Sequence, residues 1–251
     1  MDTPPFQFRI IVNCGPCEEY IAKCLRSIRA QSDVDWRAYV TVDACEDGTF
    51  EAAITAVEAD TRFLIRRNRT RRYAMRNLIE GIDQSCAAEQ DVIVVLDGDD
   101  WFATHDALRI IRRAYRQEDC WMTYGSWVPN RLGMRGLWPA YPEGTSDFRN
   151  CEWRATAVRT WKKWLWDRID DRDFRDAEGN YFRVTEDQAA MLPMLEMSGT
   201  ERARHIPDIL MVYNRISPHA VCYTRRDEML ANAEFVRRKP PYRRLEMRVC
   251  V

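Results

Sequence analysis

Long hydrophobic runs are absent from this 251-residue sequence, and no stretch approaches the ~18–20 apolar residues that a membrane span needs. The opening MDTPPFQFRI also lacks the basic start and apolar stretch of a signal peptide. Charge of one sign is missing as well, because 38 Lys and Arg face 39 Asp and Glu, for a net charge of -1. This balance does not favour a nucleic-acid or membrane surface as the main partner. We therefore expect a cytoplasmic protein with no transmembrane segment.

Two glycine-rich nucleotide motifs are missing too. There is no Gly-x-Gly-x-x-Gly and no phosphate-loop Gly-Lys-Ser/Thr, which argues against ordinary dinucleotide and P-loop enzymes. Nine cysteines are present, an odd number at scattered positions. With 46% hydrophobic residues the chain can bury a sizeable core without disulfide bonds, so reduced thiols are expected.

Two of the cysteines belong to Cys14-Gly15-Pro16-Cys17, the tetrapeptide of thioredoxin active sites. A thioredoxin places a β-α-β unit before this motif, but only thirteen residues precede Cys14 here. Asn13 stands where a Trp is usual, and no second Cys-x-x-Cys follows to complete a zinc site. The motif is interpreted as a strand-to-helix loop, and thiol chemistry is the less favoured alternative.

The first half of the chain alternates between strand and helix patterns over residues 8–124. Strands are predicted at residues 8–13, 36–43, 62–66, 91–97 and from 120 onward. Amphipathic helices are predicted at residues 18–31, 48–59, 71–82 and 104–117. This alternation predicts an α/β fold with a mainly parallel sheet, in which ligands bind at the carboxyl ends of the strands.

The pattern changes after residue 124. Residues 125–155 lose periodicity and gather Gly, Pro and Trp, and seven of the nine tryptophans lie between residues 121 and 166. We interpret them as the core of an irregular subdomain, with a cleft wall for a ring-shaped substrate as the alternative. Helices are predicted over residues 158–169 and 185–199, and a strand over 206–216. The basic stretch 237–248 is predicted to be peripheral.

The strongest chemical signal is the acidic end of the strand at residues 91–97. Asp97, Asp99 and Asp100 follow an apolar run and are interrupted only by Gly98. Burying this much negative charge is costly unless a partner neutralises it. A divalent hard cation such as Mn²⁺ or Mg²⁺ prefers such oxygen ligands. Trp101 stands where an EF-hand needs its third ligand, which excludes that motif.

The sequence resembles the inverting nucleotide-sugar glycosyltransferases of family 2, which have the GT-A fold. The resemblance covers most of residues 8–220 and rests on segments in the family's order: IIVNCGPCEEYIAKCLRSIRAQ, VTVDACEDGT, Arg76-Asn77, LDGDDW and TEDQAAMLPMLEMSG. It implies a GT-A (Rossmann-like) sheet flanked by helices, with an irregular Trp-rich acceptor subdomain. It also implies a donor-binding half over residues 1–124, an acceptor and catalytic half over 125–225, and a basic C-terminal tail over 226–251.

The resemblance also implies roles for individual residues. The expected donor-binding residues are Asn13, Cys14, Asp43, Arg76, Asp97 and Gly98. Asp43 is expected towards the base and Asp97 towards the ribose, and the expected metal residues are Asp99, Asp97 and His219. Two departures from the family pattern concern contacts with the nucleobase of the donor. Asn13, Gly15 and Pro16 stand where the family's donor loop has Pro, an aromatic residue and Asn, and Ala44 stands where a second Asp is common.

An inverting reaction needs a base on the side of the sugar opposite the leaving diphosphate. Thr185-Glu186-Asp187 places two acids at a predicted helix start, and the family's base corresponds to Asp187. Glu186 is expected to orient that base or to bind acceptor hydroxyls. In the simpler alternative, both acids only stabilise the helix dipole.

These observations favour metal-dependent, inverting transfer of a sugar from a nucleotide-sugar, most simply a UDP-sugar, to a hydroxyl of a saccharide, lipid-linked or small-molecule acceptor. Glycosylation of a hydroxylated base in nucleic acid is an alternative, suggested by seven arginines within residues 62–76 and disfavoured by the net charge. A nucleotidyltransferase needs a Gly-rich first loop, which is missing. A non-catalytic sugar-nucleotide-binding protein has no need for both the metal acids and Glu186-Asp187.

Overall fold

The computed structural model describes residues 5–116, 119–130, 138–216 and 224–246. Its described strands form one sheet in the order β3-β2-β1-β4-β7-β6-β8-β5. The strands are β1 (Phe8–Cys14), β2 (Trp36–Val42), β3 (Phe63–Arg67), β4 (Val92–Asp97), β5 (Trp101–Phe102), β6 (Met122–Pro129), β7 (Thr156–Lys162) and β8 (Ala203–Tyr213). The helices are α1 (Glu18–Arg29), α2 (Thr49–Val57), α3 (Tyr73–Gln84), α4 (Ala107–Arg116), α5 (Lys163–Trp166), the 3₁₀ helix η1 (Asp171–Phe174), α6 (Glu186–Arg202) and α8 (Arg226–Arg238).

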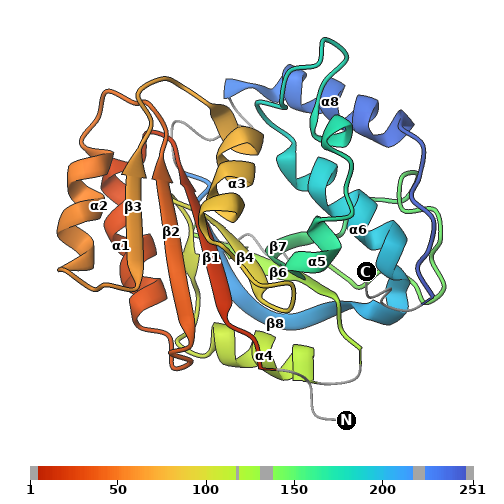
Figure 1. The fold of residues 1–251 in the computed structure, drawn as a ribbon, viewed down its shortest axis with the longest axis horizontal. Helices are drawn as coiled ribbons and strands as arrows, with labels where there is room; N and C mark the ends of the chain where they lie inside the picture. The colour runs from red at the N-terminus through yellow and green to blue at the C-terminus, as the bar shows by residue number, and fades with distance from the viewer. Residues whose placement is uncertain (1–4, 117–118, 131–137, 217–223, 247–251) are drawn as a thin grey trace.

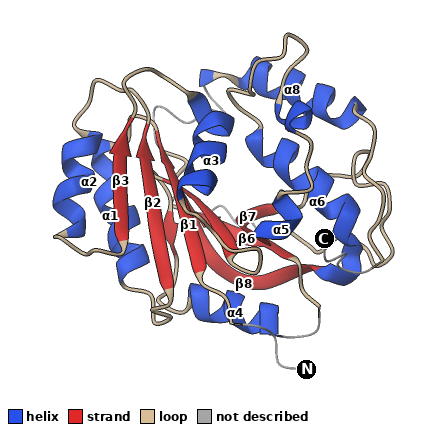
Figure 2. Cartoon of the chain, in the orientation of Figure 1, coloured by secondary structure: helices blue, strands red, loops and turns tan. Residues whose placement is uncertain are grey.

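The sheet is mainly parallel in its first half and mixed in its second. β1 pairs in parallel with both β2 and β4, and β2 pairs in parallel with β3. β7 runs antiparallel to β4 and to β6, and β8 returns parallel to β6. Figure 1 shows the parallel strands with their carboxyl ends at one edge, and Figure 2 shows helices on both faces of the sheet. The α/β expectation is confirmed.

Each central strand supplies side chains to both faces of the sheet. In β1, Ile10 and Val12 pack into the core that α1, α2 and α4 cover, whereas Ile11 packs into the core beneath α3, α5 and α6. The same alternation in β4 places Val94 and Ile93 on opposite faces. A strand covered on both sides reads as a continuous apolar run, as β4 does.

The segment around Arg159 differs from its prediction. Residues 158–169 were expected to be one helix, but the first part is β7 and only Lys163–Trp166 is helical. Val95 of β4 pairs with Arg159 of β7, so sheet pairing overrides a pattern that was too short to distinguish helix from strand.

Most of the clustered tryptophans fill the core, as expected. Trp121 and Trp164 meet edge to face with ring centroids 4.8 Å apart, and Trp161 stacks on Trp166 at 5.6 Å. All four are buried in the core beneath α3, α5 and α6. They supply the apolar area of this half of the molecule rather than an open cleft wall.

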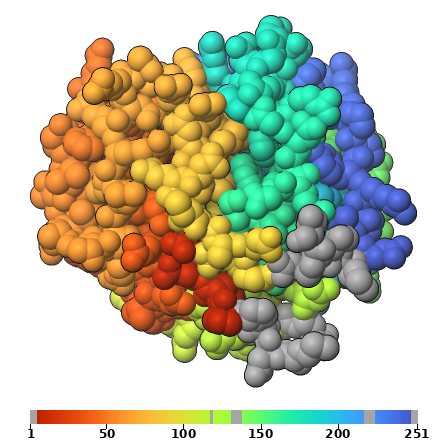
Figure 3. Space-filling view, in the orientation of Figure 1, coloured from red at the N-terminus to blue at the C-terminus, as the bar shows by residue number. Residues whose placement is uncertain are grey.

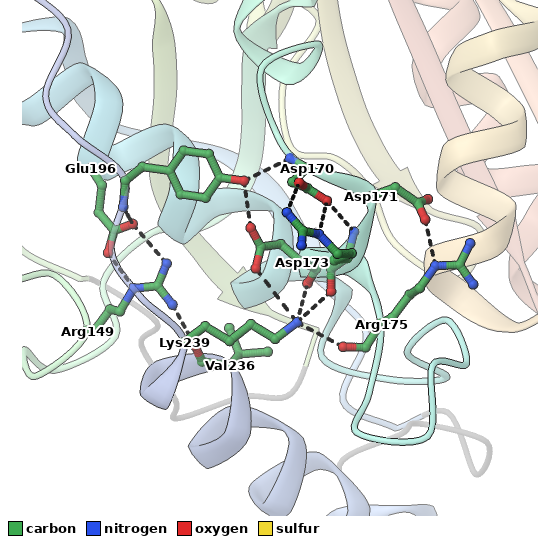
Figure 4. A network of polar contacts seen from close by, with 10 residues as sticks. Arg149, Asp170, Asp171, Asp173, Arg175, Glu196, Val236 and Lys239 are labelled. Carbon is green, nitrogen blue, oxygen red and sulfur yellow. Dashed lines mark hydrogen bonds and ion pairs between the residues drawn. The ribbon is translucent and has the colours of Figure 1, made fainter.

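The C-terminal segment packs against the second half of the molecule instead of lying apart from it. Arg149 forms a buried ion pair with Glu196 of α6 at 2.5 Å and donates to the carbonyl of Val236 in α8. Lys239 donates to the carbonyls of Arg172, Asp173 and Arg175. Figure 4 shows Lys239 beside Asp173 and Arg175. Among the described residues, no helix combines the length and apolar character that crossing a membrane requires.

Candidate active site

The candidate site lies where the strand order changes direction. β2 and β3 lie on one side of β1 while β4 lies on the other, and such switch points open a crevice at the carboxyl ends of the strands. Asn13 of β1 stands opposite Asp97 of β4 in the register. Gly98 continues this contact, because its N–H donates to the carbonyl of Asn13 at 2.8 Å. The structure therefore brings three of the predicted donor residues together.

The Cys-Gly-Pro-Cys loop packs directly beneath the acidic motif. A Cβ atom at Gly98 would lie 2.5 Å from Cys14 Sγ and 3.1 Å from Cys17 Sγ, so only glycine fits there. Both thiols are buried, and hydrogen bonding to Cys17 together with burial raises the pKa of Cys14 well above its ordinary value. A raised pKa is the opposite of what a thioredoxin-type nucleophile needs. The cysteines shape this loop.

The three acids of the motif have different surroundings. Asp97 and Asp99 are partly exposed at the crevice, whereas Asp100 is buried. Asp100 Oδ1 accepts from the backbone N–H of Asn214 at 2.7 Å, but its Oδ2 is buried with no hydrogen-bond partner in the described structure. Burial, with the charges of Asp99 and Asp97, raises the pKa of Asp100 well above its ordinary value. Burial also raises the pKa of Asp97.

This donor set fits a hard cation. Carboxylate oxygens crowd the strand end, one buried oxygen lacks a partner, and burial raises the pKa of Asp97 and of Asp100, so a bound cation would offset the cost of their negative charge. Within the described ranges no group of three or more His, Cys, Asp or Glu is arranged to hold a metal by itself. A cation here would therefore need oxygen ligands from a bound molecule, as Mg²⁺ and Mn²⁺ often do with phosphates.

Arg159 links the two predicted halves of the site. Its guanidinium lies 3.7 Å from Asp97 Oδ2 on the donor side and 3.8 Å from Asp187 Oδ2 on the catalytic side. Burial alone would lower the pKa of Arg159, but the carboxylates of Asp187 and Asp97 raise it, so this cation stays charged. The predicted base and the predicted metal acids therefore share one positive neighbour.

The start of α6 carries the two candidate acids. Arg159, Glu186 and Asp187 line a small pocket together with five apolar residues of α3, β4, β7 and α6. Burial, reinforced by the charges of Asp187 and Asp97, raises the pKa of Glu186 to about 7. Because a proton acceptor works best with a pKa near the working pH, Glu186 competes with Asp187 for the role of base.

Asp43 holds the start of α3. Its Oδ1 accepts from the N–H of Arg72 at 2.8 Å and from Asn68 Nδ2 at 2.9 Å, and its Oδ2 accepts from the N–H of Tyr73 at 2.9 Å. Asp43 is buried at the carboxyl end of β2, beside Cys14. Its contact with the nucleobase of the donor stays a prediction. The structure shows in addition that Asp43 anchors the first residues of α3 through their backbone N–H groups.

Arg76 and His219 complete the predicted set. Arg76 donates to Glu80 of its own helix at 2.5 Å and lies over the ring of Tyr181, so its described contacts are on α3 and the loop before α6, not with the aspartates. His219 lies outside the described residues. The sequence did not predict two residues of the site. Arg159 was missed because its strand was expected to be a helix, and Asn214, whose N–H donates to Asp100, was also missed.

The profile of glycosyl transferase family 2 matches residues 10–172. Solved structures of similar fold include TarS of S. aureus in complex with UDP (TM-score 0.62, 16% identity) and the mannosyltransferase PcManGT of Pyrobaculum calidifontis in complex with GDP-Man and Mn²⁺ (TM-score 0.58, 18% identity).

These similarities cover 83% and 85% of this chain, which spans 60% and 59% of the two solved chains. No curated protein matches the sequence. At such identities the structures establish the GT-A type of fold, while the profile covers well over half of the chain and agrees with the acidic motif at the switch point. The chain belongs to glycosyl transferase family 2.

Proposed function

We propose that the protein is a metal-dependent, inverting glycosyltransferase that moves a hexosyl group from a nucleotide-sugar, most simply a UDP-sugar, to an acceptor hydroxyl. The observation that carries the proposal is the position of Arg159 between Asp97 and Asp187, which joins the acidic strand end to the acid pair at the start of α6. Arg159 and both acids of that pair line one small pocket. The similar structures were solved with UDP, UDP-GlcNAc or GDP-Man with Mn²⁺, which supports a nucleotide-sugar donor. A cytoplasmic location stays a prediction.

The donor would bind at the ends of β1 and β4. Asp99 and Asp97 would hold Mn²⁺ or Mg²⁺ together with the diphosphate, and that cation supplies charge stabilisation for the leaving group. Asn13 and Gly98 present the loop that lies beneath the nucleotide, and Cys14 and Cys17 fix its shape. Arg159 keeps Asp97 oriented and adds a fixed positive charge.

The acceptor would enter from the side of α6. Asp187 takes the proton from the attacking hydroxyl, and the fixed charge of Arg159 holds its carboxylate in place. Glu186, with its pKa near 7, binds an acceptor hydroxyl or orients its neighbour. Attack from this side, opposite to the leaving diphosphate, inverts the anomeric configuration.

The proposal is tested by incubating the protein with a panel of UDP- and GDP-sugars and following release of the nucleoside diphosphate. We expect slow hydrolysis of at least one donor that requires Mn²⁺ or Mg²⁺ and is abolished by Asp99→Ala. Glu152→Gln, at an exposed carboxylate away from the acidic strand end, is the matched control and should retain the wild-type rate. Release at the wild-type rate in excess chelator would contradict the metal role.

A further inference from the structure

The seven arginines within residues 62–76 fall into two groups. Four of them, Arg62, Arg66, Arg67 and Arg76, form ion pairs with acids of α2, α3 or the loop before β3. The other three, Arg69, Arg71 and Arg72, are exposed on the loop that leads into α3. Within the described parts of the chain, none of these three side chains forms an ion pair, although Arg72 lies close enough to Glu80 to interact with it electrostatically. Ion pairs on a solvated helix face account for the presence of the first four arginines. They do not account for Arg69, Arg71 and Arg72.

Three arginines from separate segments converge on Tyr73, the first residue of α3. The guanidinium carbons of Arg71, Arg183 and Arg225 lie 5.3, 5.0 and 5.1 Å from the centre of its ring. Arg225 is ion-paired with Glu228 at 2.7 Å. Arg71 and Arg183 are exposed and make no ion pair with any residue that the structure describes. We call Arg71, Arg183 and Arg225 the arginine rim.

The rim concentrates positive charge that the protein does not neutralise. Because all three guanidinium groups surround one ring, they lie within about one Debye length of each other, roughly 10 Å at 0.1 M salt, so their repulsion is only partly screened. Glu228 pairs with Arg225, and the Asp43 carboxylate accepts from the backbone N–H groups of Arg72 and Tyr73, so neither acid forms an ion pair with Arg71 or Arg183. An anion placed between Arg71 and Arg183 would relieve this repulsion, and planar guanidinium groups match phosphate and carboxylate geometry.

The arginine rim lies close to the segment that carries the candidate general bases, Glu186 and Asp187. Arg183 precedes Glu186 by three residues, and its carbonyl accepts from the N–H of Ala74 at 3.4 Å, so the segment before α6 lies against the start of α3. In Figure 1 the loop into α3 lies at the same end of the molecule as the carboxyl ends of β1, β2 and β3. Figure 3 shows the gold surface around α3 meeting the teal surface of the segment before α6.

We infer that the arginine rim binds an oxyanion, phosphate or carboxylate, carried by the acceptor close to the hydroxyl that is glycosylated. The inference rests on the proposed function and specifies its acceptor as an anionic sugar or small molecule. Binding of this anion at Arg71 and Arg183 positions the hydroxyl at the start of α6. The proposed function assigns the donor diphosphate to Asp97 and Asp99, whereas the contact of the rim with the expected donor side runs through the backbone N–H of Tyr73 and Asp43.

The compactness of the rim favours one anionic group over a nucleic-acid backbone. A duplex is bound by cations spread along successive phosphates, and its affinity falls steeply with salt. Here three guanidinium groups surround a single ring, and the arginines on either side of this loop, Arg67 and Arg76, are already paired with Glu51 and Glu80.

The test compares three matched probes by calorimetry, in the free protein and in the protein with UDP and Mn²⁺: glucose 6-phosphate, glucuronate and glucose. We expect at least one anionic probe to bind about tenfold or more tightly than glucose, the usual effect of one charge-assisted hydrogen bond. Tighter binding of glucose 6-phosphate would identify the bound anion as a phosphate, and tighter binding of glucuronate would identify it as a carboxylate. The variant Arg71→Gln/Arg183→Gln should lose this preference, while Arg113→Gln, an exposed arginine on α4, should keep it.

Equal binding of the three probes, or no binding of any, would overturn the inference. So would an Arg71→Gln/Arg183→Gln variant that binds the anionic probe normally. If that variant instead loses affinity for UDP, the rim serves the donor; if the wild type prefers a 15-base-pair DNA duplex through the same arginines, the acceptor is nucleic acid. A separate titration with UDP and Mn²⁺ reports on the proposed function, so its failure is distinguishable from failure of the rim.

Discussion

Glu186 carries the clearest pH signal of any single residue in the site. Burial raises its pKa from an ordinary 4.5 to about 7, which means that the folded protein holds this proton more tightly than the unfolded chain does. The contribution of protonated Glu186 to the free energy of unfolding is therefore fully present below pH 4.5 and is lost as the pH rises through about 7.

We therefore expect the metal-free protein to lose stability between these two pH values, and Glu186→Gln to remove part of that loss. Urea unfolding at a series of pH values measures the difference, with a slope of up to about 1.4 kcal/mol per pH unit for one proton. Glu178→Gln, at an exposed position in the loop before α6, is the control. Identical pH dependence in wild type and Glu186→Gln would show that this carboxyl is not desolvated.

The sequence predicts some residues of the site well and others poorly. The acids at the end of β4 could be predicted because an apolar strand ending in carboxylates is a local pattern. Arg159 could not, because its importance comes from a position between Asp97 and Asp187 that only the sheet creates. The donor-binding role of Arg76 stays a prediction, and its described contacts lie with Glu80 and Tyr181.

At the scale of elements, the turn after β4 and the loop after β1 fit each other closely. A methyl group at position 98 would lie 2.5 Å from Cys14 Sγ, so one of the two segments would have to move. Gly98→Ala should therefore cost about 1–3 kcal/mol in the free energy of unfolding, as overpacking of a tight site does.

A double-mutant cycle isolates this contact. In the Cys14→Ala background the closest sulfur is gone, and Gly98→Ala should cost clearly less than it does in the wild type. Urea unfolding of the four proteins gives the coupling. If Gly98→Ala costs the same in both backgrounds, the thiol of Cys14 does not determine the glycine at this turn.

The second half of the chain was predicted unevenly: the strand expected over residues 206–216 overlaps β8, but β7 was taken for part of a helix and α8 was not predicted. The helix predicted over residues 185–199 is confirmed within α6, which begins at Glu186. β7 was missed because a seven-residue segment carries too few repeats for its period to be recognised, and its partners β4 and β6 are distant in sequence.

At the scale of the whole molecule, the C-terminal segment is part of the second half rather than an appendage. Arg149 and Glu196 are almost fully buried, with 6% and 3% of their side chains exposed, and they join the loop before β7 to α6 and α8. Removing one partner of such a pair leaves an uncompensated buried charge.

Arg149→Ala should therefore destabilise the protein by about 3–5 kcal/mol. The matched control is Arg238→Ala, which breaks the exposed pair with Glu234 and should cost less than about 1 kcal/mol. Thermal and urea unfolding measure both variants. Similar, small costs for the two would mean that the segment after β8 contributes little to the fold.

The proposed site is divided between two halves of the molecule: the donor and its cation would bind at the ends of β1 and β4, and proton transfer would take place at the start of α6. The most direct test is to measure donor affinity by calorimetry and the rate of nucleoside diphosphate release for Asp187→Asn. This change keeps the size of the side chain but removes its ability to take a proton.

We expect donor affinity to remain within about twofold of the wild type while the rate falls by a factor of about 10²–10⁴, the usual contribution of a general base. Glu186→Gln should lose less. A near-normal rate for Asp187→Asn with an inactive Glu186→Gln would assign the base to the other acid, and full activity of both variants would contradict a catalytic role for α6.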